Sequence, residues 1–105
     1  MSKYKTWKCG ICNEPVIEGQ RFLFLRKYGF VHLECVIEKI SEKSMLNRDL
    51  VGLIDANEVL AYTIIRLKQS ESMSSDEKIR ELIVSTRKEL EKRSAALSSE
   101  LEKFL

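Results

Sequence analysis

The sequence predicts a small α+β fold, in which a metal-stabilised N-terminal part is followed by a mostly antiparallel pair of helices. Three observations support this prediction. All three cysteines and the single histidine of the 105 residues lie in the first third of the chain. Residues 21–31 are typical of a β-hairpin, and from residue 33 onwards apolar residues recur at helical spacing. At this length we expect one domain with two unequal parts, residues 1–46 and residues 47–105.

The cysteines and the histidine form the pattern C-x2-C-x19-H-x2-C, whose members are Cys9, Cys12, His32 and Cys35. Zinc prefers four sulfur or imidazole ligands in a tetrahedron, and two short pairs of equal spacing can supply them. We therefore predict one structural Zn²⁺ ion bound by these four side chains. Two alternatives stay open: buried apolar cysteines beside a satisfied histidine, and a redox-active Cys-x-x-Cys motif, whose usual βαβ context is missing here.

The residues around the four ligands predict the local structure of this N-terminal finger. Gly10 and Asn13 suit a metal-binding turn, or zinc knuckle, because both residue types tolerate unusual or left-handed backbone angles. Residues 21–31 then form the hairpin, and His32 and Cys35 lie at the start of a helix. The positive end of that helix dipole offsets part of the charge of three thiolates. Knuckle, hairpin and helix start, in this order, form the treble-clef arrangement.

Three short motifs resemble segments of known families: residues 7–12 (WKCGIC), residues 18–22 (EGQRF) and residues 31–35 (VHLEC). They resemble a family of short archaeal proteins of unknown function that carry a single zinc finger at the N-terminus and helices behind it. The ligand spacing and the third motif also resemble one half of a LIM domain. This resemblance implies that the four residues of the pattern are zinc ligands. A complete LIM domain has a second four-ligand module directly after the first, and this chain has none.

A second helix is expected over about residues 56–69. Asp55 and Glu58 have the spacing of a capping box, which places the start of the helix directly after Asp55. A start at Asp49, with Gly52 tolerated inside the helix, is the alternative. The helix is apolar nearly all round, and such a helix should be covered on most sides.

A third helix is expected over about residues 75–104, with Ser74 and Glu77 as its capping box. Because it is about twice as long as the second helix, its C-terminal apolar side chains would lack partners within the chain. This difference predicts a homodimer through the C-terminal helices, or binding of an unknown protein partner. Asn57 is either an amide that sets the register of the helix seam or an exposed residue of the first turn. The candidate interface residues are Asn57, Leu60, Ile64, Leu67, Leu97, Leu101 and Phe104.

The charge distribution bears on nucleic-acid binding. The net charge of +2 divides into nine Lys/Arg against five Glu in residues 1–48, or +4, and nine Lys/Arg against eleven Asp/Glu in residues 49–105, or −2. Any attraction to polyanions therefore belongs to the first half of the chain. A basic-aromatic face of residues 3–28 is the alternative functional site, although its charge excess is small for a nucleic-acid module. Its candidate contacts are Lys5, Trp7, Lys8, Arg21, Arg26, Lys27 and Tyr28.

Catalysis is not expected. Four protein ligands close the coordination sphere of zinc, and the only histidine is one of them. We therefore predict a non-catalytic zinc-binding protein, a small adaptor or regulator whose helical tail mediates self-association or partner binding. The sequence contains neither an apolar run of membrane-spanning length nor a signal-peptide core, and three cysteines held as zinc thiolates fit a reducing compartment. A cytoplasmic protein is expected.

Overall fold

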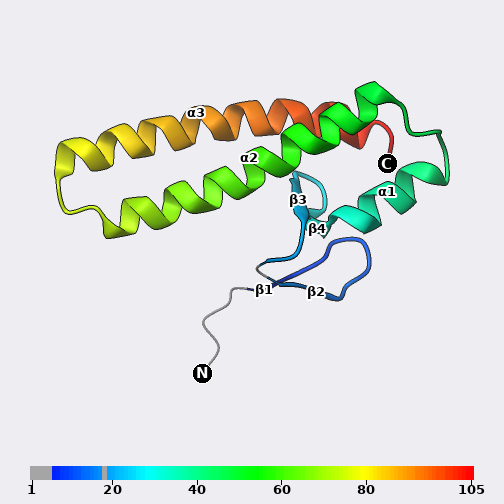
Figure 1. Cartoon of the computed structure of the whole chain (residues 1–105), viewed down its shortest axis with the longest axis horizontal. Helices are drawn as coiled ribbons and strands as arrows, with labels where there is room; N and C mark the ends of the chain where they lie inside the picture. Colours follow the sequence, from blue (N-terminus) through cyan, green and yellow to red (C-terminus); the bar gives the residue numbers. More distant parts are fainter. Residues whose placement is uncertain (1–5, 18) are drawn as a thin grey trace.

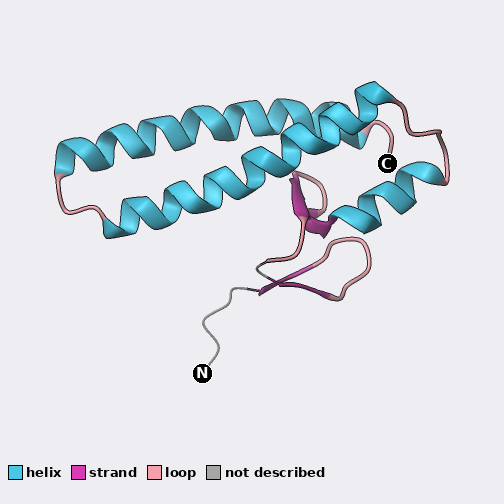
Figure 2. Ribbon diagram, viewed as in Figure 1, coloured by secondary structure: helices cyan, strands magenta, loops and turns pink. Residues whose placement is uncertain are grey.

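A computed structural model describes residues 6–17 and 19–105, and it confirms the α+β class. A small finger lies beneath one half of a helical hairpin, and the other half of the hairpin extends beyond the finger (Figure 1). The finger contains the strands and the shortest helix (Figure 2). The elements are β1 (Thr6–Lys8), β2 (Pro15–Ile17), β3 (Phe22–Leu25), β4 (Gly29–His32), α1 (Leu33–Ser41), α2 (Arg48–Met73) and α3 (Glu77–Glu102).

The finger contains two antiparallel hairpins. In the first, β1 pairs with β2 so that Trp7 lies opposite Val16. In the second, β3 pairs with β4 so that Leu23 lies opposite Val31. The turn between β3 and β4 uses Gly29 at a φ of 78°, a backbone conformation that favours glycine. The second hairpin confirms the prediction for residues 21–31, whereas the β1–β2 pair was not expected.

Helix α1 begins at Leu33, as the sequence predicts, and buries Leu33, Val36 and Ile40. These residues are three and four positions apart, so they lie on one face of the helix. His32 precedes the helix in an extended conformation with a ψ of 142°. The last metal-ligand candidates therefore lie where β4 ends and α1 begins.

Helix α2 is longer than predicted, and the start near residue 56 is wrong. It begins at Arg48, because the side chain of Asn47 accepts a hydrogen bond of 2.9 Å from the backbone N–H of Leu50 and so caps the helix. Leu50 and Ile54 are buried on one side of this additional segment. Burial of these two side chains, each worth about 2 kcal/mol, outweighs the cost of about 1 kcal/mol for a glycine inside a helix. Gly52 is thus tolerated, and the Asp55–Glu58 pair lies inside the helix.

Helix α3 begins after Asp76, whose side chain accepts a hydrogen bond from the backbone N–H of Ile79. Asp76, rather than Ser74, is therefore the N-cap. Helices α2 and α3 have 26 residues each, so the predicted difference in length is wrong. They pack as a hairpin, and Arg87 of α3 forms an ion pair with Glu71 of α2 near the far end. None of the helices in the described part of the chain has the length and apolar character needed to cross a membrane.

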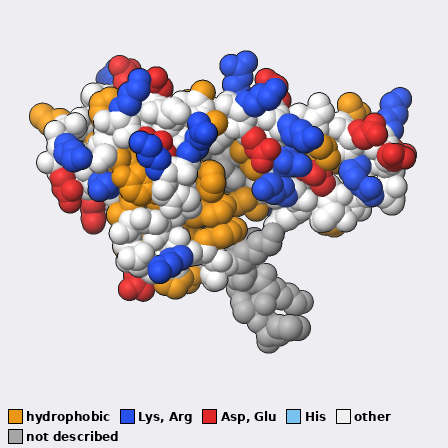
Figure 3. Space-filling model, turned by 180° about the vertical axis from the view of Figure 1, so that it is seen from behind, with side chains coloured by type: hydrophobic (Ala, Val, Ile, Leu, Met, Phe, Trp, Pro, Cys, Tyr) orange, Lys and Arg blue, Asp and Glu red, His pale blue; other side chains and the backbone are white. Residues whose placement is uncertain are grey.

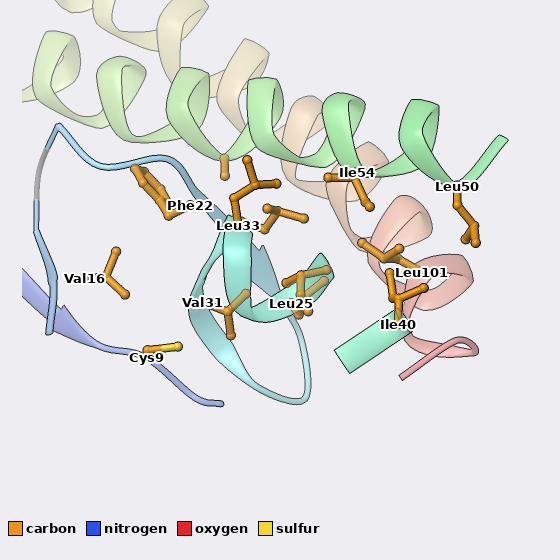
Figure 4. Packing of buried hydrophobic residues seen from close by; sticks show 13 residues of the cluster. Cys9, Val16, Phe22, Leu25, Val31, Leu33, Ile40, Leu50, Ile54 and Leu101 are labelled. Carbon is orange, nitrogen blue, oxygen red and sulfur yellow. The ribbon is translucent and has the colours of Figure 1, made fainter. Parts of the chain in front are cut away.

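One hydrophobic core connects the finger to the helical hairpin of α2 and α3. Its side chains extend from Cys9 beside the first hairpin, through Leu25 and Val31, to Ile40 and Leu101 (Figure 4). Leu101, near the end of α3, is fully buried in this core. Burial of a leucine side chain stabilises a fold by about 2 kcal/mol. The end of the chain therefore helps to hold the finger.

Side chains of α2 and α3 also form hydrogen bonds with the backbone in and directly after β3. The Oδ1 atom of Asn57 accepts a hydrogen bond of 3.2 Å from Phe24 N, and Ser98 Oγ accepts one of 2.9 Å from Arg26 N. Glu102 accepts a hydrogen bond of 2.9 Å from the N–H of Lys27. Phe24 lies in β3, an edge strand of a two-stranded sheet, and Arg26 and Lys27 lie in the turn that follows it, so strand pairing cannot satisfy all of these backbone groups. The contacts thus fix the finger against both long helices.

Candidate metal centre

The first two ligand candidates lie on a tight turn between β1 and β2. The backbone N–H of Ile11 points to Cys9 Sγ at 3.4 Å, that of Cys12 at 3.5 Å, and the N–H of Glu14 points to Cys12 Sγ at 3.4 Å. Asn13 adopts a φ of 67°, the left-handed conformation predicted for it. These N–H groups stabilise negative charge on the two sulfur atoms, as a zinc knuckle does.

Gly10 serves this turn in a different way from the one predicted. Its φ is not positive, so no unusual backbone angle requires glycine there. Instead the turn lies directly against the backbone of Tyr28: a Cβ atom at Gly10 would lie 2.8 Å from the carbonyl carbon of Tyr28 and closer still to its oxygen. The N–H of Gly10 donates a hydrogen bond of 3.0 Å to the carbonyl oxygen of Phe30. Glycine is needed here because two backbone segments touch.

The other two ligand candidates come from the end of β4 and the first turn of α1. The donor atoms of all four side chains lie within 4.8 Å of one another. His32 Nδ1 is 3.4 Å from Cys12 Sγ and 3.7 Å from Cys35 Sγ. A tetrahedral ion with bonds of about 2.3 Å to sulfur and about 2.0 Å to nitrogen would place such atoms about 3.5 Å apart. The geometry therefore fits four ligands around one metal ion.

The His32 ring is oriented by the backbone. Its Nε2 atom lies 3.0 Å from the carbonyl oxygen of Pro15, a group that can only accept a hydrogen bond. The proton therefore belongs on Nε2, which leaves the lone pair of Nδ1 directed at the sulfur atoms. The Pro15 carbonyl is a functional group that side-chain patterns could not reveal, because its position depends on the pairing of β1 with β2.

The thiols of this site have very different proton affinities before a metal binds. Burial raises the pKa of Cys9, but backbone N–H groups of Cys12, His32 and Ile11 together outweigh burial and lower it to about 6. Burial raises the pKa of Cys35, and hydrogen bonding and charge from the neighbouring sulfur atoms raise it further, to about 12. At neutral pH Cys35 thus retains its proton until a cation compensates the charge.

The residues predicted to contact nucleic acid lie at several places on the finger. Trp7 stacks on Phe30 with ring centroids 4.3 Å apart, and Arg21 forms a bidentate ion pair with Glu58 at 2.7 Å. Arg26 and Lys27 are exposed at the opposite end of β3, and Lys8 is exposed on β1. Tyr28 is partly buried beside Lys39, and Lys5 lies outside the described residues. Nucleic-acid contact by this set stays a prediction.

The predicted interface residues lie within the chain's own fold. Leu101 is fully buried in the core, and Phe104 packs against it. Asn57 is fully buried at β3, so both predictions for it, the interchain seam and the exposed first turn, are wrong. The sequence could not show this because the partner of Asn57 is a backbone group 33 residues away. The remaining candidates are partly buried on α2 and α3: Leu60, Ile64, Leu67 and Leu97.

Comparisons with known proteins agree with the resemblance of the finger motifs. No curated protein and no solved structure matches the chain. A family model for an uncharacterized protein conserved in archaea (DUF2175) matches residues 5–103, which is nearly the whole chain. The chain belongs to this archaeal protein family.

Proposed function

We propose that the protein is a non-catalytic zinc-binding adaptor in which one structural Zn²⁺ ion holds the finger together. The observation that carries this proposal is the convergence of three sulfur atoms and one imidazole nitrogen within 4.8 Å. This donor set is typical of structural zinc sites. A segment of the finger's size buries too little apolar surface for independent stability, and structural zinc can supply on the order of 10 kcal/mol of apparent binding energy.

The same donor set argues against catalysis. A catalytic zinc ion keeps one coordination position open for water or substrate, whereas here four protein side chains occupy the tetrahedron. The only histidine of the chain is one of the four, so no second histidine is available as an acid or base. Three thiolate ligands also fit a reducing compartment, and we propose that the protein is cytoplasmic.

Metal analysis of purified variants tests the site. We expect one zinc per chain in the wild type and little zinc, with reduced thermal stability, in Cys35→Ser and His32→Ala. His32→Cys is the matched control, because four cysteines also form a structural zinc site and zinc should be retained. If Cys35→Ser keeps stoichiometric zinc and full thermal stability, the assignment of the ligands is wrong.

The adaptor role rests on the helical hairpin, part of which extends beyond the finger (Figure 1). Met73, Ile79 and Leu82 are 83%, 53% and 63% exposed near the turn between α2 and α3. We propose that a second copy of the chain covers them in a homodimer, whose interface lies at the turn between α2 and α3. Light scattering should show a dimer that Leu82→Glu weakens and the exposed control Ser85→Glu does not. A monomeric wild type at high concentration would refute the dimer alone.

A further inference from the structure

Two hollows lie side by side beneath α2, where the finger meets the hairpin. The first has a volume of about 250 Å³ and lies between Phe24 and Phe30 of the finger and Ile64 and Ala95 of the helices. The second has a volume of about 360 Å³ and lies between Trp7 and Phe22 of the finger and Val59 and Tyr62 of α2. Ile65 lines both, so the hollows adjoin. We call the two hollows together the junction groove.

The walls of the junction groove are apolar and partly exposed. Phe24, Val59 and Tyr62 are 39%, 62% and 54% exposed, and each lines one of the hollows. In the view from behind, hydrophobic side chains gather below the hairpin and beside the finger (Figure 3). Contiguous apolar surface in a concave site is typical of places where a ligand or partner binds.

The charges at the junction groove that remain available are positive. Its two carboxylates are already engaged: Glu58 with Arg21 at 2.7 Å, and Glu91 with Arg87 at 3.0 Å. Arg26, Arg66 and Lys68 also line the groove, and none of them forms an ion pair with any residue that the structure describes. The rim is therefore complementary to a ligand that carries negative charge beside its apolar groups.

The first hollow also contains a polar group. Ser94 is only 5% exposed and lines this hollow, and among the described residues its hydroxyl has no hydrogen-bond partner. The neighbouring Ser98, in contrast, accepts a hydrogen bond from Arg26 N and donates one to Glu102. A polar ligand group that enters this hollow can therefore hydrogen-bond to Ser94.

We propose that the junction groove binds an acidic amphipathic segment of a partner protein. Its apolar side chains enter the two hollows, and its carboxylates contact Arg26, Arg66 and Lys68. The inference rests on the adaptor function proposed above and names the kind of partner. A peptide fits better than a nucleic acid, because the ring faces of Trp7 and Phe30 already stack on each other and the apolar helix residues of the first hollow are aliphatic.

A binding assay with synthetic probes tests the proposal. The probe is a fluorescently labelled peptide with leucine at helical spacing and glutamate elsewhere, compared with versions in which serine replaces leucine or lysine replaces glutamate. We expect only the first peptide to bind, with an affinity that decreases as salt is added. Failure of the leucine–glutamate peptide to bind, or equal binding of the lysine version, overturns the proposal.

Paired variants locate the binding site. Ala95→Phe fills the first hollow, whereas Ala96→Phe adds the same ring at an exposed position outside the groove. We expect about a tenfold or larger loss of affinity for the first variant and none for the second. Arg66→Gln combined with Lys68→Gln, both on α2, should cause a similar loss of affinity. The control is Lys88→Gln combined with Lys92→Gln, which removes two exposed charges of α3 outside the groove and should leave the affinity unchanged. Equal affinities within each pair would contradict the proposed site.

Two further measurements separate the possible outcomes. Zinc content is determined on the same samples, so that a protein with full zinc and no peptide binding refutes this inference and leaves the zinc proposal intact. A protein that binds the peptide but holds no zinc supports this inference and refutes the zinc proposal. Labelled oligo(dT) is included as a separate probe, and binding that Ala95→Phe abolishes would identify a nucleic acid, rather than a peptide, as the ligand.

Discussion

Replacement of Gly10 by alanine is predicted to destabilise the protein, because the metal-binding turn touches the backbone of Tyr28. The added Cβ atom would lie 2.8 Å from the Tyr28 carbonyl carbon, closer than the 3.0 Å below which such contacts are essentially not found. The neighbour is backbone and cannot rotate away, so the turn itself must shift. This shift weakens the hydrogen bond between Gly10 N–H and the Phe30 carbonyl oxygen, which is 3.0 Å long.

The size of the effect follows from two contributions. Crowding in a packed site costs about 1–3 kcal/mol, and loss of one backbone hydrogen bond costs about 1 kcal/mol, which together give about 2–4 kcal/mol. Because the φ of Gly10 is not positive, alanine adds no strain from its backbone angles. At about 4–8 °C per kcal/mol for a domain of this size, the melting temperature should fall by at least about 8 °C.

Gly52→Ala is the matched control with the opposite sign. Gly52 lies inside α2, and a Cβ atom there would meet nothing within 4 Å. Alanine in a helix interior is more favourable than glycine by about 0.5–1 kcal/mol, so this variant should be more stable than the wild type. Thermal and denaturant unfolding with saturating zinc, followed by far-ultraviolet circular dichroism and Trp7 fluorescence, measures both. A Gly10→Ala protein that unfolds like the wild type would show that the contact with Tyr28 does not exist.

Three further predictions concern the metal, a buried amide and the end of the chain. Zinc binding at pH 7 should release at least the proton of Cys35, whose pKa is about 12, and zinc affinity should fall more steeply below about pH 6, where Cys9 also gains a proton. Calorimetry in buffers of different ionisation enthalpy measures the number of protons released, and zinc binding without proton release would contradict the prediction. Asn57→Ala leaves the partly buried N–H of Phe24 without its acceptor and should cost about 1–3 kcal/mol in denaturant unfolding, whereas a cost near zero would mean that water replaces the amide. A chain that ends before Leu97 lacks the buried part of α3 and should lose thermal stability even with zinc bound; an unchanged melting temperature would show that the finger does not depend on α3.

The finger was the part of the fold that the sequence predicted best, because its information is local. Equal spacing of the two ligand pairs indicated the metal site, and an apolar, aromatic run followed by a turn with Gly29 indicated the β3–β4 hairpin. The start of α1 at Leu33 follows from the change to helical spacing. The β1–β2 pair was missed, since three-residue strands beside a knuckle leave no alternating pattern.

The helical hairpin was predicted less well, because its details depend on distant contacts. Gly52 and the Asp55–Glu58 spacing look like a helix start, yet burial of Leu50 and Ile54 against the finger extends α2 through both. The apolar residues near the end of α3 illustrate the same difficulty. An unpartnered stripe along α3 suggested a second chain, but the apolar end of that helix packs on the chain's own finger. The sequence alone cannot distinguish the two cases.

The position of Leu101 has a consequence for the order in which the protein is made. Its side chain completes a core that begins at Cys9, and the Lys43 ammonium group binds the backbone oxygen of Leu105 at the end of the chain. During synthesis the four ligand candidates leave the ribosome long before these last residues. A metal ion can therefore assemble around the nascent finger early, while the surface that receives α3 stays exposed until α3 has been synthesised. The finger is thus completed by a helix that is synthesised long after the metal ligands.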